Sequence, residues 1–189
     1  MANTISIPYR RKREGKTDYK KRMKMLLGNK PRLAVRKSLK HISLQIIEFQ
    51  PKGDKIILTA HTRELAKHGW KAGTQNTGAA YLVGLLLAKK AKKKIECALD
   101  IGQNTSVKGS VLYATAQGAV DGGLNLSVSK EVVPNVQRIR GEHIANYAKQ
   151  LKANKEKYEK QFGKYIKANL DPETLPQHFD TVKKTIGAL

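Results

Sequence analysis

The sequence predicts an α/β protein with a mixed sheet that starts as an antiparallel meander, helices packed on one face, a basic N-terminal arm and a C-terminal helical extension. Three observations indicate this fold class. Apolar and polar residues alternate between residues 30 and 60, helical and strand-like patterns follow one another up to residue 130, and positive charge gathers before residue 41. A helix between two strands is typical of a crossover connection, so the sheet is expected to be mixed. We expect the arm at residues 1–29, the α/β core at 30–130 and the extension at 131–189.

The composition indicates a folded protein with a polyanionic partner. The chain has 189 residues, of which 40% are hydrophobic, and 37 Lys and Arg against 15 Asp and Glu give a net charge of +22. One domain with appendages fits this length. The single cysteine, Cys97, excludes an internal disulfide and a cysteine-ligated zinc site. The longest apolar run, residues 78–88, is about half of what a transmembrane helix needs, and no signal-peptide core precedes it. We therefore expect a cytoplasmic protein that does not contact a membrane.

The N-terminal arm holds more than half of the charge excess. Residues 1–40 contain 14 Lys and Arg but only 2 Asp and Glu. Such a segment has little apolar surface of its own, so we expect it to become ordered when phosphates neutralise it; a solvated or targeting-type tail is the alternative. Tyr9 lies among arginines with no apolar partner nearby in the sequence, which makes it a candidate for stacking on bases. The candidate contacts in the arm are Tyr9, Arg10, Arg11, Lys12, Arg13, Lys16, Lys20 and Lys21.

A short helix is expected near the end of the arm. Thr17 or Asp18 can cap it, and Gly28 followed by Asn29 supplies its end. Spacings of i, i+4 and i+7 predict an apolar face for packing, with lysines on the opposite face. That apolar face would consist of Tyr19, Met23 and Leu26.

The next segment predicts three strands, at residues 32–36, 41–49 and 55–60. The loop 37–40 joins the first two, and a turn at 51–54 precedes the third. Because strand residues alternate between the two faces of a sheet, one face should be apolar and the other polar and cationic. The polar face could bind a polyanion or could be an ordinary solvated surface. Its expected members are Arg32, Arg36, His41, Ser43, Gln45 and Thr59.

Helices and one buried strand complete the expected core. Thr62 is a plausible cap for a turn at 63–68, and Thr74 for a helix that continues to Ala91. The lysines at 89, 90 and 92–94 suit the C-terminal end of that helix, although a second RNA contact is an open alternative. A buried strand is expected at 95–101, with Cys97 as a core residue, and a helix at 110–120.

The extension after Pro134 is expected to be helical. Apolar and aromatic residues recur at helical spacing between 144 and 162 and again between 175 and 186. Asp171 with Pro172, or Pro176, would mark the start of the last helix. These helices should pack on the sheet domain or on a neighbouring protein.

The usual catalytic constellations are missing from the sequence. The loop 102–110 is not a phosphate loop, because Gly109 separates Lys108 from Ser110. Asp100 ends a strand, where two-metal nucleases hold carboxylates, but such sites need three or four acidic groups. Only Glu48 and Glu96 are near candidates, so we favour Asp100 as a cap of the following loop. We predict no catalytic residue, no metal ion and no cofactor.

Several segments together resemble the large-subunit ribosomal proteins that bind 5S rRNA, in the archaeal form with a C-terminal extension. The resemblance covers nearly the whole chain, and residues 155–189 are its least distinctive part. The combination of segments is far more specific than any one of them. The matching residues are 8–19, 30–38, 40–42, Asn76, 79–81, 84–86, 99–102, 138–144, Tyr147 and Ala148.

The resemblance implies a structural constituent of the ribosome. Its domain would bind 5S rRNA in the central protuberance and contact the large rRNA and neighbouring ribosomal proteins. Two rival functions are a non-specific cationic RNA chaperone and, less favoured, a metal-dependent nuclease at Asp100. The family's contacts, carried over to this chain, add the hairpin and the turn after the third strand to the arm. They are Tyr9, Arg10, Arg11, Lys12, Arg13, Lys16, Arg36, Lys37, Ser38, His41, Thr59, Thr62 and Arg63.

Overall fold

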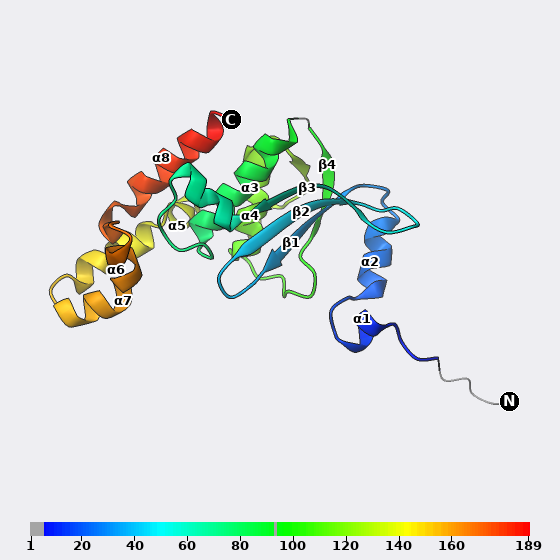
Figure 1. Cartoon of the computed structure of the whole chain (residues 1–189), viewed down its shortest axis with the longest axis horizontal. Coiled ribbons are helices and arrows are strands. Elements are labelled where there is room, and N and C mark those ends of the chain that lie inside the picture. The colour runs from blue at the N-terminus through cyan, green and yellow to red at the C-terminus, as the bar shows by residue number, and fades with distance from the viewer. Residues whose placement is uncertain (1–5, 93) are drawn as a thin grey trace.

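The computed structural model describes residues 6–92 and 94–189, and within them five strands form one mixed sheet of order β3-β2-β1-β4-β5 (Figure 1). The meander expected from the sequence is confirmed, because β1 pairs antiparallel with β2, and β2 with β3. The crossover is confirmed too, since β4 runs parallel to both β1 and β5. Strand β5 was not predicted, because two residues carry no periodic signal. The strands are β1 (Arg32–Lys37), β2 (Ile42–Glu48), β3 (Lys55–His61), β4 (Glu96–Asp100) and β5 (Asn125–Leu126).

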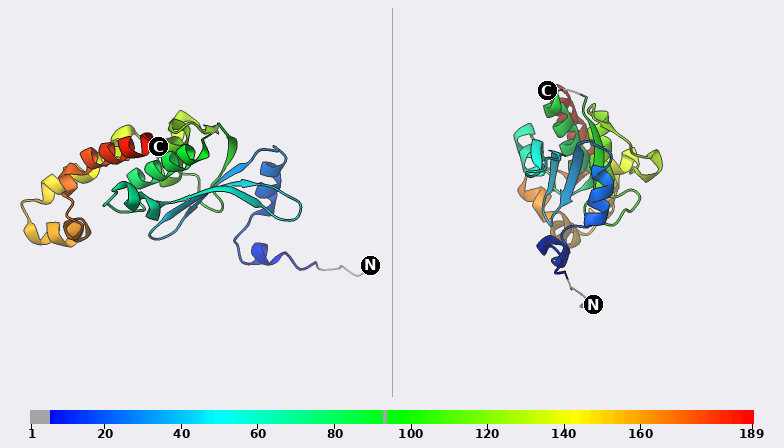
Figure 2. Two further views of the ribbon diagram at one scale, coloured as in Figure 1. Left: turned by 45° about the horizontal axis from the view of Figure 1, so that its top comes forward. Right: turned by 90° about the vertical axis from the view of Figure 1, so that its right-hand side faces the viewer.

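The hydrophobic core lies between the sheet and two helices, α3 (Thr77–Ala91) and α4 (Val111–Asp121). The inward residues of β1 and β2 are fully buried against these helices. Figure 2 shows the helices stacked on one side of the sheet. Helix α3 is buried on every side from Gly78 to Ala88, because α4 and the C-terminal helix cover what the sheet does not.

Helices α3 and α4 touch backbone to backbone at two glycines. A Cβ atom added at Gly84 would lie 2.1 Å from the carbonyl oxygen of Thr115, and one at Gly118 would lie 2.0 Å from that of Tyr81. Real Cβ atoms do not approach so closely, so glycine is required at both positions. This contact gives the sheet a closely packed support.

Two helix caps differ from the sequence prediction. Asn76 caps α3 by accepting a hydrogen bond from the backbone N–H of Ala79, whereas Thr74 donates its hydroxyl to the carbonyl of Lys40. His61, not Thr62, caps the 3-10 helix η1 (Thr62–His68). Both predictions were wrong by one to two residues, because several neighbouring polar side chains can cap and only the path of the chain selects one.

Thr62 is buried instead of exposed. Its Oγ1 accepts a hydrogen bond from the backbone N–H of Ile42 and lies 3.3 Å from Nδ1 of His41. The hydroxyl therefore joins the end of β3 to the start of β2. Because the side chain is fully covered, the expectation that a ligand can reach Thr62 is wrong.

The C-terminal extension packs on the sheet domain, which was one of the two placements expected. Phe179, Val182 and Ile186 are buried along α8, which lies against α3. The Trp70 and His178 rings stack with their centroids 5.2 Å apart and fasten α8 to the end of η1. The other elements are η2 (Lys130–Val132), α5 (Val136–Arg140), α6 (Glu142–Leu151), α7 (Lys155–Lys167), η3 (Pro172–Thr174) and α8 (Leu175–Gly187).

The lysine cluster at the end of α3 is partly engaged within the protein. Lys89 donates to the carbonyl of Gly187 at 2.8 Å, and Lys90 pairs with Glu64. Lys93 lies outside the described residues. Among the described residues, none of the helices has both the length and the apolar character needed to cross a membrane.

Candidate nucleic-acid interface

The basic arm forms two helices on the sheet face opposite α3 and α4 (Figure 2). Helix α1 (Arg10–Arg13) consists of four basic residues and α2 (Tyr19–Leu26) follows a turn at Gly15, whose φ is +62°. Arg11 donates Nε–H to the hydroxyl of Thr17 at 2.8 Å, which holds this turn. All residues of α1 are exposed, so its charges face solvent.

Tyr9 has an aromatic partner that the sequence did not predict. Its ring centroid lies 5.3 Å from that of Tyr19, although 73% of the Tyr9 residue remains exposed. The expectation that Tyr9 lacks an apolar neighbour is therefore wrong. One edge of the ring is supported by the protein and the rest is open, which is a suitable arrangement for stacking on a base.

Helix α2 is capped by Asp18, one of the two expected caps, whose Oδ1 accepts from the backbone N–H of Lys21 at 3.1 Å. The predicted apolar face was wrong at Met23, which is 64% exposed, whereas Tyr19 and Leu26 are half-buried. Arg22 and Met25 instead line the cleft between the helix and the sheet. The reason is electrostatic: Arg22 forms two hydrogen bonds to Asp54, at 2.8 and 2.9 Å, and this fixes the rotation of α2.

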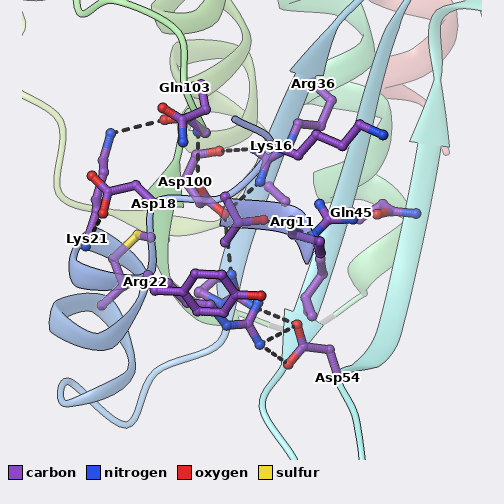
Figure 3. A pocket seen from close by; sticks show the side chains of 17 residues that line it. Arg11, Lys16, Asp18, Lys21, Arg22, Arg36, Gln45, Asp54, Asp100 and Gln103 are labelled. Carbon is purple, nitrogen blue, oxygen red and sulfur yellow. Dashed lines mark hydrogen bonds and ion pairs between the residues drawn. The ribbon is translucent and has the colours of Figure 1, made fainter. Parts of the chain in front are cut away.

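An arginine–aspartate cluster, made of Arg22, Arg32, Arg36, Asp54 and Asp100, attaches the arm to the sheet (Figure 3). Asp54 accepts from Arg22 and from Arg32, both at 2.8 Å. Asp100 accepts from Arg32 at 3.3 Å and from Arg36 at 2.8 Å. The cluster therefore joins α2, β1, β4 and the turn before β3.

The sequence predicted Arg32 on an open face of the sheet, and this prediction was wrong. Its side chain is only 4% exposed, like that of Asp100. Alternation did place it on the outer face of β1, but α2 covers that part of the sheet. Buried ions of this kind are held by their partners and are not free to bind phosphate.

Asp100 stays ionised because its partners outweigh its burial. Burial alone would raise the pKa of the Asp100 carboxyl, but hydrogen bonds from Arg36 and from the Gly102 N–H, with the charges of Arg36 and Arg32, hold that pKa below its usual value. Oδ1 accepts from the Gly102 N–H at 2.8 Å, which is the loop cap that the sequence favoured. Gly102 has φ +64° and a Cβ there would lie 3.1 Å from the Arg36 guanidinium.

The alternative role of Asp100 as a nuclease carboxylate has no support in this geometry. Glu96, its neighbour on the same strand face, pairs with Lys30 at 2.5 Å. Among the described residues, no group of three or more His, Cys, Asp and Glu could hold a metal ion. The surroundings of Asp100 are cationic, and they organise the arm.

The tip of the β1–β2 hairpin is held by its own backbone and by the loop before α3. The Ser38 hydroxyl donates to the carbonyl of His41 at 2.9 Å, and Gln75 donates to the carbonyl of Ser38 at 2.8 Å. The rings of His41 and His61 lie 4.9 Å apart. Burial, then the nearby His41 and Arg63, lower the pKa of His61, so that His61 is neutral and accepts from the Arg63 N–H.

The structure brings the arm and the outer sheet face together into one cleft, shown in Figure 3. Arg11 and Lys16 of the arm face Arg36 and Gln45 of the sheet across it, and Lys21 donates to the carbonyl of Gly102 at 3.2 Å. The cleft residues that the prediction missed include Arg22, Asp54 and Gln103. Arg22 was part of the basic run, whereas Gln103 had no sequence signal. The other predicted residues that lie exposed around the cleft and at the hairpin tip are Arg10, Lys12, Arg13, Lys20, Lys37, Ser38, Thr59 and Arg63.

Comparison with known proteins gives two findings. A family model described as "Ribosomal large subunit proteins 60S L5, and 50S L18" matches residues 4–98, which include the arm, the meander, η1 and α3. The chain is also similar to the large ribosomal subunit protein uL18 of Thermofilum pendens. The two are 49% identical over 183 residues, which are 95% of this chain and 93% of that protein. The second match includes nearly all of the C-terminal extension.

Proposed function

The chain belongs to the family of ribosomal large-subunit proteins 60S L5 and 50S L18, and from this premise we propose that it binds 5S rRNA and attaches it to the large rRNA in the central protuberance. Membership in the family makes the chain a structural component of the large ribosomal subunit in the cytoplasm, with rRNA and ribosomal proteins as its partners. The identity of the RNA and its place in the subunit belong to the proposal. We propose no catalytic role.

The observation that carries the proposal is the cleft in which the cationic arm faces the polar side of the sheet. Phosphates neutralised by Lys and Arg release condensed counterions, which supplies affinity for any RNA. The cluster around Asp54 and Asp100 fixes α2 and holds the arm in place.

Selectivity would come from the shape of the polar surface. Gln45 and Thr59 lie opposite each other on β2 and β3, and Arg36 lies opposite Ser43 on β1 and β2. Proteins recognise folded RNA mainly through its shape, its 2′-hydroxyls and its unstacked bases. The Arg36 side chain is 46% exposed and its guanidinium is fixed by Asp100, so it presents its remaining surface in one orientation. Tyr9 and His41 are the proposed stacking groups.

The proposed contacts follow the sequence prediction with two exceptions. Arg32 and Thr62 are omitted because both are buried. The remaining residues are exposed, apart from His41 at the hairpin tip, which is half-buried. The proposed set is Tyr9, Arg10, Arg11, Lys12, Arg13, Lys16, Lys20, Lys21, Arg36, Lys37, Ser38, His41, Thr59 and Arg63.

The proposal is tested by titrating the full chain with 5S rRNA and with a control RNA of equal length, over a salt series and with Mg²⁺ present. Preference for 5S rRNA is expected, with affinity that falls steeply as salt increases. Equal affinity for both RNAs would instead indicate a general cationic chaperone. RNA cleavage that requires Mg²⁺ and disappears in Asp100→Asn would indicate a nuclease.

Arg36→Ala separates shape recognition from general attraction. We expect it to weaken 5S rRNA binding by roughly tenfold while binding of the control RNA changes little, because a fixed shape contact discriminates between partners. The matched variant Lys20→Ala removes an exposed charge of the arm and should weaken both RNAs alike. If Arg36→Ala also affects both RNAs equally, the specific role given to Arg36 is wrong.

A further inference from the structure

Helix α7 of the C-terminal extension carries a lysine stripe that the proposed 5S rRNA surface does not include. Lys157, Lys160, Lys164 and Lys167 recur at i, i+3, i+7 and i+10, so they lie on one side of the helix. All four are exposed. The opposite side is aromatic: Phe162 is buried and its ring lies 5.2 Å from that of Tyr158 and 5.9 Å from that of Tyr165. Packing therefore fixes which side of α7 the lysines occupy.

The lysines of the stripe have no ion-pair partner within the described residues. Glu156 and Glu159 belong to the same helix, yet neither lies within salt-bridge distance of a stripe lysine. Like charges three or four residues apart on a helix repel one another. By contrast, Lys152, at the end of α6, pairs with Glu173 at 2.8 Å. In this structure the stripe lysines therefore lie outside ion-pair distance of every described carboxylate, and an anionic partner would stabilise them.

The stripe continues into a groove at the hairpin tip. Lys164 and Tyr165 line this groove together with Lys40 of the tip and Lys71 of the loop before α3. His41, a proposed 5S rRNA contact, also lines the groove and marks the border between the two surfaces. None of the described residues that line it is acidic. Segments far apart in the sequence therefore converge there with charges of one sign, and the tip groove and the lysine stripe form one cationic surface.

The chemistry of this surface fits a phosphate backbone better than a protein. Protein interfaces are depleted of lysine and have an apolar, aromatic centre. Here the aromatic residues of α7 face inward, and Leu39 is the only strongly exposed apolar side chain among the described residues that line the groove. Evenly spaced, exposed lysines bind phosphates without base recognition.

The basic arm and the lysine stripe lie toward opposite ends of the molecule, with α1 at one end and α7 at the other (Figure 1). We propose that the lysine stripe and the tip groove bind the backbone of the large-subunit rRNA while the arm and the outer sheet face hold 5S rRNA. This inference rests on the proposed function for the identity of the first RNA. It assigns the C-terminal extension an RNA contact of its own, so that one protein joins two RNA molecules.

The test uses the full chain bound to labelled 5S rRNA, presented to immobilised, deproteinised large-subunit rRNA. Capture of labelled 5S rRNA without protein gives the baseline. In Lys160→Glu/Lys164→Glu, we expect capture to weaken at least ~10-fold and its logarithmic salt slope to fall by about two, because two phosphate contacts are lost. Affinity for 5S rRNA, measured separately, should stay within about twofold.

The matched control is Lys149→Glu/Lys184→Glu, which changes the same charge at two exposed lysines of the extension outside the stripe. It should leave capture and 5S rRNA binding unchanged, and circular dichroism should show the same helix content for both variants. Equal capture by the stripe variant and the control overturns the proposal. The stripe would then face solvent or contact a protein. A matching loss of 5S rRNA affinity in the stripe variant also overturns it, because the stripe would then belong to the first site.

The inference and the proposed function can fail separately. If the wild-type chain shows no preference for 5S rRNA, the proposed function fails. Binding of the large-subunit rRNA to the protein alone is then measured with the same two variants. A loss confined to the stripe variant supports the RNA contact of α7 even in that case.

Discussion

The N-terminal arm and the C-terminal extension are attached to the same domain by different forces. Every residue of α1 and α2 lies at least partly exposed, and the cluster of Arg22, Arg32 and Arg36 with Asp54 and Asp100 holds α2 on the sheet. Helix α8 is instead held by buried apolar side chains such as Phe179 and Val182. The difference shows that the net charge of a segment does not tell how many of its charged side chains are free to bind a partner. We call the charges that form no ion pair within the protein available charges. Arg22 of the arm and Arg32 and Arg36 of β1 form ion pairs within the protein, whereas the stripe lysines of α7 form none among the described residues.

The largest effect is expected when the apolar attachment is broken. Phe179→Ala removes a buried ring that lies 5.7 Å from Tyr81 and leaves a cavity between α8 and α3. The free energy of unfolding should fall by about 4 kcal/mol. Denaturant titration in low and in high salt measures it, and the loss should be the same in both, because apolar burial is not screened. The control Val136→Ala, at a largely exposed position, should cost less than about 1 kcal/mol.

A slightly smaller loss is expected when the ionic attachment is broken. Asp100→Asn leaves the buried Arg32 without one of its two carboxylates and should lower the free energy of unfolding by about 3 kcal/mol. Denaturant titration measures this loss. Glu96→Gln is the matched control, because its partner Lys30 is about half exposed, and it should cost less than about 1 kcal/mol. Equal losses in the two variants would show that the buried cluster stabilises the fold no more than an exposed ion pair does.

The third effect concerns charge that the arm keeps available. Replacing Arg10, Lys12 and Arg13 by alanine should leave stability unchanged, because α1 has no buried residue. Affinity for 5S rRNA should fall by roughly tenfold or more, about 1.4 kcal/mol, and the salt slope by about three. Filter binding over a salt series measures both quantities. A large loss of stability with an unchanged salt slope would contradict the division between anchoring and available charges.

The smallest expected effect is a pH dependence of the attachment of α8 that the attachment of α2 lacks. Burial, then the charge of Lys71, lower the pKa of His178 below its usual 6.5, and its Nε2 accepts from the Lys71 N–H at 3.2 Å. Undocked His178 binds a proton more readily, so this contribution is complete above pH 6.5 and is lost as the pH falls toward the lowered pKa. The Asp100 carboxyl, whose pKa is lowered from 3.8, stays ionised in that range.

Hydrogen exchange at pH 7.5 and 5.5, corrected for intrinsic rates, measures this difference. Amides of α8 should exchange somewhat faster at pH 5.5, while those of α2 should not change. His178→Gln keeps an acceptor for Lys71 but does not titrate, so it should reduce the pH effect on α8. Part of the pH effect should remain in this variant, because burial also lowers the pKa values of His61 and His143. Faster exchange in α2 but not in α8 would reverse the assignment of the two attachments.

Much of the fold was predictable because its signals are local. The alternation of Leu33 and Val35 with Arg32 and Arg36 specified a strand and its two faces, and the spacing of Phe179, Val182 and Ile186 specified the last helix. The caps at His61 and Asn76 were missed, because neighbouring polar residues offer equal local alternatives. The packing face of α2 was also missed, since it depends on Asp54, which lies 32 residues beyond Arg22.

The sequence by itself determined the class of the fold, the position of the charge excess and the kind of partner that such charge attracts, because composition and periodicity do not depend on how distant segments meet. Only the tertiary structure decided which charged side chains form ion pairs within the protein. It pairs Arg32 with Asp100 across 68 residues and brings Lys40, Lys71 and Lys164 to one groove. Electrostatic interaction depends on distance in space, and the folded chain alone sets that distance.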